Sequence, residues 1–264
     1  MKNRAAVLLL AVLAACGGGQ VETQPGLEVS TRLTAEQLDS QFVAAQALLA
    51  DRDWRDAAVA FERLLLELPR GDRRLPLARV SLAESRFGAK SYLQAVREFR
   101  RISDEYPTDT LAAYGLVRAG DSYAKLWRRP ELDPTYGTQA LATYNEAIAR
   151  YPEGRFADTA RARVAHLEDW FAIKQFKNAS FYLRYKAHDS AILVLRDLLF
   201  RYPRSSVAPE ALSRLIDTYR ELGYEEEVQE SCGFFRSTHP QSPLLGESCP
   251  DSLAATPSPS GPGD

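Results

Sequence analysis

Histidine, cysteine and methionine are scarce in this chain of 264 residues, which has three histidines, three cysteines and one methionine. The cysteines form no CxxC pair and the histidines form no HExxH motif, so we predict no metal site. A GxSxG motif is also lacking, and we predict that the protein is not an enzyme. The formal net charge of −2 argues against a nucleic-acid partner, because general binding to phosphates needs a surplus of cations.

Long apolar runs are scarce as well. One covers residues 5–15 and follows the basic residues Lys2 and Arg4. Its eleven residues are too few to cross about 30 Å of hydrocarbon at a rise of about 1.5 Å per residue. The pattern therefore favours a cleaved secretory signal over residues 1–15 and disfavours a membrane-spanning helix.

The end of this run, Leu13-Ala14-Ala15-Cys16, resembles a bacterial lipobox. The resemblance implies that the signal is cleaved before Cys16 and that the thiol of Cys16 becomes lipidated. An ordinary signal peptide with a cysteine nearby is the alternative. Because Gly17 rather than aspartate follows, the resemblance also implies an anchor at the periplasmic face of the outer membrane. We expect no cofactor besides this covalent lipid.

Two segments have the composition of flexible chain. Residues 16–35 contain few large apolar side chains, which predicts a tether between the membrane and the fold. Residues 246–264 are rich in proline, serine and glycine, which predicts a disordered tail. The folded part is therefore expected over residues 36–245.

One pattern recurs five times between these segments. In its first copy, Trp54, Ala57, Phe61 and Leu65 are spaced by three or four residues, and Pro69 follows. This spacing places the apolar residues on one face of a helix, and proline ends the helix because it lacks an amide donor. The later copies contain Ala95 and Phe99, Ala140 and Tyr144, Ala191 and Leu195, and Val228 and Cys232.

A second helix is expected before each copy, and such pairs resemble the tetratricopeptide repeat, a helix-turn-helix unit that stacks into a solenoid. We therefore predict an all-α fold, a solenoid of about five tetratricopeptide-like repeats. Two lengthened parts are expected, namely a long loop over residues 127–138 and an unusually long helix over residues 156–186. Gly137 occupies the place of an aromatic residue, so the pattern leaves the packing there open.

The lipobox, the number of repeats and the lengthened fourth repeat together resemble the BamD family of outer membrane assembly lipoproteins over residues 36–245. Residues 181–192, 202–206 and 222–243 support the resemblance. It implies a scaffold that binds unfolded outer membrane proteins and a BamA-like barrel insertase, together with other lipoproteins of the assembly complex. A different periplasmic repeat adaptor, for division, pilus assembly or export, is the alternative. A cell-wall hydrolase on a helical scaffold is a further one.

In repeat solenoids the first helix of each repeat lines the concave face, and this register predicts where a substrate peptide would bind. The expected groove is apolar and aromatic, which suits a peptide that carries aromatic residues. Packing of the same side chains on neighbouring helices or on the tether is the alternative. The predicted groove residues are Phe42, Gln46, Leu49, Val80, Phe87, Tyr114 and Val117.

The carboxy-terminal half carries two further features. Its surface mixes charges of both signs, and the family resemblance assigns docking of the insertase to this half. Cys232 and Cys249 remain once Cys16 takes lipid, and an oxidising periplasm would permit a disulfide between them. Simple packing of Cys232 in the core is the alternative. The charged residues are Arg184, Arg214, Arg220, Asp217 and Glu221.

Overall fold

The computed structural model describes residues 33–250, and every regular element in that range is an α-helix. The predicted all-α repeat fold is confirmed. The predicted signal over residues 1–15, Cys16 with most of the tether, and the tail beyond residue 250 lie outside the described residues.

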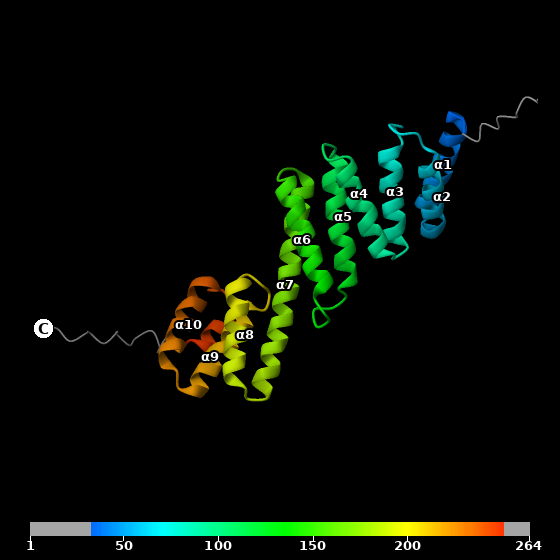
Figure 1. The fold of residues 1–264 in the computed structure, drawn as a ribbon. Coiled ribbons are helices and arrows are strands. Elements are labelled where there is room, and N and C mark those ends of the chain that lie inside the picture. Colours follow the sequence, from blue (N-terminus) through cyan, green and yellow to red (C-terminus); the bar gives the residue numbers. More distant parts are fainter. Residues whose placement is uncertain (1–32, 251–264) are drawn as a thin grey trace, which may run out of the picture. The chain divides into compact units, whose positions relative to one another are not determined.

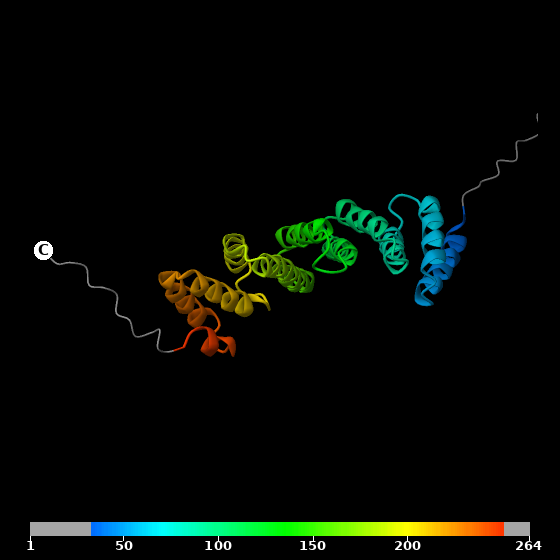
Figure 2. The same ribbon diagram turned by 90° about the horizontal axis from the view of Figure 1, so that it is seen from below.

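The helices follow one another as antiparallel pairs, one pair to each predicted repeat, and a short final helix comes last (Figure 1). Each helix packs against the next along the chain, as both views show (Figure 2). The helices are α1 (Ala35–Ala50), α2 (Trp54–Glu67), α3 (Leu75–Gly88), α4 (Tyr92–Glu105), α5 (Thr110–Leu126), α6 (Thr135–Arg150), α7 (Arg155–Arg184), α8 (His188–Arg201), α9 (Ala208–Leu222), α10 (Glu225–Thr238) and α11 (Leu244–Ser248).

Local chemistry fixes where the array begins and where its helices end. Thr34 caps α1 in a reciprocal capping box, in which its side chain accepts from the amide of Gln37 and the side chain of Gln37 accepts from the amide of Thr34. The fold therefore starts slightly inside the predicted tether. The five repeat prolines each lie two residues beyond the last residue of α2, α4, α6, α8 or α10.

The small and aromatic repeat positions form the core. Ala57 and Phe61 of the first copy, and Ala140 and Tyr144 of the third, have no exposed surface. An alanine at the crossing of two helices allows their backbones to approach closely. The aromatic ring packs against the first helix of the same pair, Phe61 on Phe42 of α1 and Tyr144 on Gly120 of α5. The repeat pattern in the sequence therefore marks the buried seam of the array.

The two predicted irregularities occur with altered bounds. The predicted helix over residues 156–186 is the thirty-residue α7. The predicted loop over residues 127–138 is shorter, because α6 already begins at Thr135. The loop lies against α7, where the ammonium of Lys174 donates to the carbonyl oxygens of Glu131 and Leu132 at 3.2 and 2.9 Å.

The predicted tail begins too early. Residues 246–248 belong to α11, and Ser248 is buried with its hydroxyl 2.8 Å from that of Ser213 on α9. Composition alone did not reveal this docking, because it depends on contacts with a distant helix and on Cys249. Within residues 33–250, we find no helix with the length and apolar character needed to cross a membrane.

Candidate functional site

The first helices of four successive repeats, α1, α3, α5 and α7, contact one another in that order. We call their partly exposed residues the first-helix face. Most of the predicted groove residues lie on this face and are neither fully buried nor fully exposed. They are Phe42, Gln46, Leu49, Val80, Phe87 and Tyr114.

Val117 does not belong to this face. Its side chain is 3% exposed and packs in a cluster with Leu116 of α5 and Leu167 of α7. The predicted place of Val117 in the groove is therefore wrong, because the stacking of α7 on α5 covers that side of the helix.

Two predicted groove residues link neighbouring helices. The ring of Phe42 meets that of Phe61 edge to face, with 6.3 Å between centroids. The amide of Gln46 donates a 2.9 Å hydrogen bond to the hydroxyl of Ser81 on α3. The packing alternative therefore accounts for Phe42 and Gln46.

Around Arg118 of α5, the first-helix face carries a cluster of charged and polar groups. The Nε and Nη2 atoms of Arg118 each donate a 2.7 Å hydrogen bond to one carboxylate oxygen of Glu84 on α3. The guanidinium carbon lies 4.1 Å from the ring centroid of Phe87, which adds a cation–π contact. The hydroxyl of Tyr114 donates to the same carboxylate. Glu84 thus joins α3 to α5 at the centre of the face.

Burial and these hydrogen bonds fix the charges of the cluster. Burial, reinforced by the hydrogen bond and charge of Glu84, raises the pKa of Tyr114 above its ordinary value. Burial by itself would lower the pKa of Arg118, but the bonds and charges of Glu84 and Asp121 raise it overall. At neutral pH, Tyr114 therefore remains a neutral donor and Arg118 remains a cation.

Asp121 extends the network to α6 and α7. It accepts a 3.0 Å hydrogen bond from Arg118 and a 2.7 Å hydrogen bond from the hydroxyl of Tyr144, and it pairs with Arg163 of α7 at 3.2 Å. Burial, then the negative charge of Asp121, raises the pKa of Tyr144. The predicted groove set lacked Arg118 and Arg163, although the spacing of four from Tyr114 to Arg118 indicates a shared helix face.

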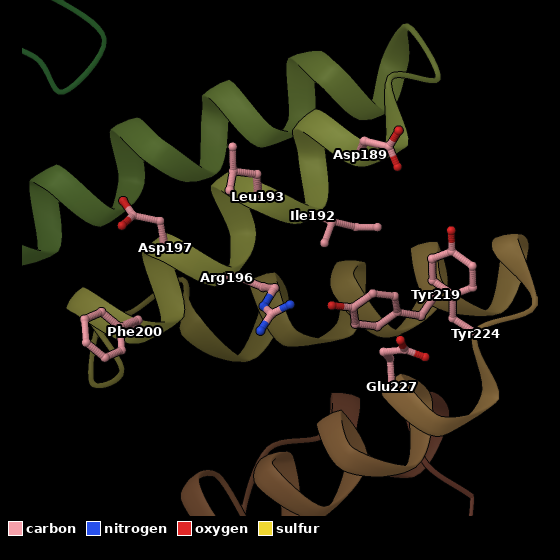
Figure 3. Close-up of a pocket in the computed structure, with 9 residues that line it drawn as sticks. All are labelled: Asp189, Ile192, Leu193, Arg196, Asp197, Phe200, Tyr219, Tyr224 and Glu227. Carbon is pink, nitrogen blue, oxygen red and sulfur yellow. The ribbon is translucent and has the colours of Figure 1, made fainter.

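A second concave surface lies between α8, α9 and α10 (Figure 3). It encloses about 600 Å³ and exposes two large apolar side chains of α8, Leu193 at 72% and Phe200 at 86%. Single exposed apolar residues are common, but a group beside a groove marks an interaction surface. The other lining residues are Asp189, Ile192, Arg196, Asp197, Tyr219, Tyr224 and Glu227.

Most of the charged residues predicted for partner docking form ion pairs with residues three or four positions away on the same helix. Arg220 lies 3.2 Å from Asp217, and Arg214 lies 3.7 Å from Glu210. Arg220 also donates to the backbone oxygen of Ser248, so part of its role is to hold α11. These exposed pairs contribute little to stability and leave their charges accessible.

The histidine and cysteine residues of the described range make packing, charge or disulfide contacts that suit a structural role. His166 packs on Trp170 with 5.5 Å between ring centroids, and His188 faces Glu221 at 3.7 Å. Cys232 and Cys249 form a disulfide that joins α10 to the end of α11. Over residues 33–250, no three histidine, cysteine or acidic side chains gather in a metal-binding arrangement.

Comparison with known proteins gives a consistent family. The family model for YfiO, described as an outer membrane lipoprotein, matches residues 34–232. The outer membrane protein assembly factor BamD of Rickettsia prowazekii is 24% identical, with 74% of this chain and 77% of the relative covered. The BamD proteins of Caulobacter vibrioides and Xylella fastidiosa are 24% and 26% identical, with coverage of 86% and 80% of this chain and 72% and 75% of the relatives. The predicted resemblance is confirmed.

Solved repeat structures are also similar. The TPR2AB-domain:pHSP90-complex of yeast Sti1 aligns over 81% of this chain and 82% of that chain, with 12% sequence identity and a TM-score of 0.45.

Proposed function

Since the chain belongs to the YfiO family of outer membrane lipoproteins, we propose that it acts as an assembly factor for outer membrane proteins. The observation that carries the proposal is the extent of the family match, which runs from the cap of α1 to the middle of α10. The match thus covers almost the whole repeat array. The protein would act as a scaffold, whose function depends on binding surfaces rather than on catalytic groups.

We propose that unfolded outer membrane proteins bind along the first-helix face. Phe87 and Tyr114 supply partly exposed aromatic surface, and the Glu84–Arg118 pair holds both in place. An aromatic surface beside fixed polar groups suits an extended peptide, because the rings give affinity and the polar groups fix orientation.

The groove on α8, α9 and α10 is proposed as the docking site for a BamA-like barrel insertase. Leu193 and Phe200 are exposed there, and the same groove is lined by Arg196 and by the carboxylates of Asp189, Asp197 and Glu227 (Figure 3). Exposed apolar side chains beside charged groups are a usual composition of a specific protein interface. Other lipoproteins of the assembly complex are further expected partners.

Attachment to the outer membrane through lipid on Cys16 is part of the same proposal. The family description supports the location, and the motif Leu13-Ala14-Ala15-Cys16 supports the anchor. A Cys16→Ser variant should leave the membrane fraction, and the mature wild-type protein should carry the mass of attached acyl chains. A mature protein whose mass shows no acyl chains on Cys16 would contradict the lipid anchor and would leave the rest of the proposal standing.

Affinity capture from detergent-solubilised outer membranes tests the docking proposal. The wild-type chain should recover a barrel insertase, and Phe200→Glu should lose it because a carboxylate replaces an apolar anchor. Leu66→Glu is the matched control, since Leu66 on α2 is 85% exposed and lies at the other end of the array. Equal recovery by both variants would remove the α8 groove from the proposal, and no insertase with the wild type would overturn docking itself.

Binding of unfolded substrate is tested on the other surface. Phe87→Ala should weaken binding of a barrel-derived peptide, with an unchanged far-ultraviolet circular dichroism spectrum. Leu93→Ala on α4 is the control, because Leu93 is 46% exposed and belongs to the second helix of its repeat. Unchanged peptide affinity in a folded Phe87→Ala protein would exclude this face.

A further inference from the structure

The loop between α2 and α3 lies at the same end of the first repeat as the start of α1 (Figure 1). Leu66, one residue before the end of α2, is 85% exposed, and Leu77 in the first turn of α3 is 48% exposed. A Cβ added at Gly71 in the loop would meet nothing within 4 Å, so the loop borders open space. We call residues 66–77 the first-repeat tip.

The first-repeat tip carries two cations without an acidic partner. Its carboxylate Asp72 accepts hydrogen bonds from the Nε and Nη2 atoms of Arg74 at 2.8 and 2.6 Å. Arg70 and Arg73 are exposed, and neither forms an ion pair within residues 33–250. With Glu67 at the end of α2, the tip holds three arginines and two acids, which leaves a net charge of +1.

The first-repeat tip also lies beside the point at which the chain enters the fold. The Nη1 atom of Arg74 lies 2.7 Å from the carboxylate of Asp39 on α1 and 3.4 Å from the backbone oxygen of Ala35, the first residue of α1. Residues 16–33 precede the cap of α1, and a chain of that length spans at most about 60 Å. An anchor at Cys16 would therefore hold the tip within that distance of the membrane surface.

We propose that the first-repeat tip lies against the lipid surface to which the anchor attaches the protein. The inference rests on the proposed lipid anchor at Cys16 and adds a second point of contact, which sets the orientation of the first repeat on the membrane. Leu66 and Leu77 enter the boundary between headgroups and acyl chains. Arg70 and Arg73 bind lipid phosphates, for which the guanidinium group is well suited.

A lipid surface suits the first-repeat tip better than a protein partner does. Two leucines on either side of an exposed loop offer too little area for the well-packed core of a protein interface. The same small area makes the lipid contact weak by itself, because little apolar surface is buried. An attached anchor raises the effective concentration of the lipid surface at the tip, so that a weak contact is still formed.

A fluorophore at a single thiol tests the contact in the full-length, acylated protein. The three cysteines of the chain are then occupied by lipid and by the disulfide, so Leu66→Cys supplies one free thiol for an environment-sensitive label. The protein is reconstituted into vesicles of phosphatidylethanolamine and phosphatidylglycerol, with and without brominated acyl chains. The control is Leu193→Cys, because Leu193 on α8 is 72% exposed and lies outside the tip.

We expect brominated lipids to quench the label at position 66 at least about twofold more than the label at position 193, because only the former enters the lipid boundary. Quenching at position 66 that is no stronger than at position 193 would overturn the proposal.

Removal of the two cations tests their part in the contact. With the label at position 66, Arg70→Ala together with Arg73→Ala should lower the ratio of contacting to free tip about tenfold, because two attractions to lipid phosphate are lost. The matched control replaces Lys90 and Arg97 by alanine, since both are exposed cations outside the tip. An equal loss in the control would reflect the net charge of the protein and would overturn the assignment to the tip.

The remaining outcomes separate the tip contact from the proposed function. A mature protein without acyl chains on Cys16 that fails to stay with the vesicles would overturn the anchor and the tip contact together. An acylated protein on the vesicles with an unquenched label at position 66 would overturn the tip contact alone. Leu66→Glu should still capture the insertase in detergent, where no lipid surface is present, and loss of capture would indicate a protein partner at the tip and overturn the proposal.

Discussion

The hydroxyl of Tyr144 on α6 donates a 2.7 Å hydrogen bond to the carboxylate of Asp121 on α5. The ring of Tyr144 has no exposed surface, and Asp121 also receives Arg118 of its own helix and Arg163 of α7. One carboxylate therefore ties the second helix of the third repeat to the first helices of two repeats. This connection supports the same face on which we place substrate binding.

Replacement of Tyr144 by phenylalanine should cost about 1 kcal/mol of unfolding free energy, because Asp121 loses one donor while the ring remains packed. Urea unfolding measures the change. Tyr123→Phe is the control, since Tyr123 stacks on Tyr136 and its hydroxyl has no hydrogen bond within residues 33–250. A similar loss in both variants would show that the bond to Asp121 contributes nothing special.

Gly120→Ala should destabilise the fold even though alanine is the better helix former. A Cβ atom at position 120 would overlap the ring of Tyr144, and overpacking of this kind costs roughly 1–3 kcal/mol. Gly233→Ala on α10 should instead stabilise the fold, because no atom lies near the added Cβ and alanine gains up to about 1 kcal/mol of helix propensity. Thermal or urea unfolding that gives the same sign for both variants would contradict the packing at Gly120.

The disulfide should be present in protein purified without reductant. Intact mass after alkylation should show no adduct on Cys232 or Cys249 before reduction and two adducts after it. Cys249→Ser should cost roughly 3 kcal/mol, given the sequence separation of 17 residues, and should release α11 from α10. Two free thiols in the unreduced wild-type protein would refute the bond.

Acid should weaken the contact between α1 and the loop before α3. Hydrogen bonds from Arg74 lower the pKa of Asp72 from 3.8 to about 2, and Arg74 also pairs with Asp39 of α1 at 2.7 Å. Because the folded pKa is the lower one, the stability from Asp72 is present above pH 3.8 and is lost as the pH falls towards about 2.

Asp72→Asn should therefore be less stable than the wild type at neutral pH, and the difference should shrink from about pH 4 to about pH 2. Urea midpoints across this range measure it. Asp104→Asn is the control, since Asp104 is exposed and has no ion pair within residues 33–250. A difference that stays constant down to about pH 2 would exclude the role assigned to Asp72.

The sequence predicted much of the fold because its signals are local. The spacing of Trp54, Ala57 and Phe61 indicates a helix face regardless of what packs against it, and the prolines end the second helices wherever they occur. The bounds were less accurate. Residues 246–248 have the composition of a tail, but contacts with α9 and the bond to Cys249 hold them in a helix.

The candidate site was predicted only in part, because the burial of a side chain depends on which neighbouring helix packs against it. Helical register correctly placed Phe87 and Tyr114 on the first-helix face, and the same register placed Val117 there, although α7 covers it. Register also could not show which cations are already paired. Arg118 and Lys125 belong to the same helix, yet two hydrogen bonds pair Arg118 with Glu84, and within residues 33–250 no acidic side chain pairs with Lys125.

By itself, the sequence determined the helical repeats, because spacing along one chain segment is enough to define an apolar helix face. The tertiary structure decided what lies between the repeats. Gly137 stands where the pattern expects an aromatic residue, and the indole of Trp127 from the preceding loop fills that space. The ring in this space thus comes from a different part of the chain than the repeat pattern predicts. Its position depends on the three-dimensional path of the loop, which the local spacing of residues does not show.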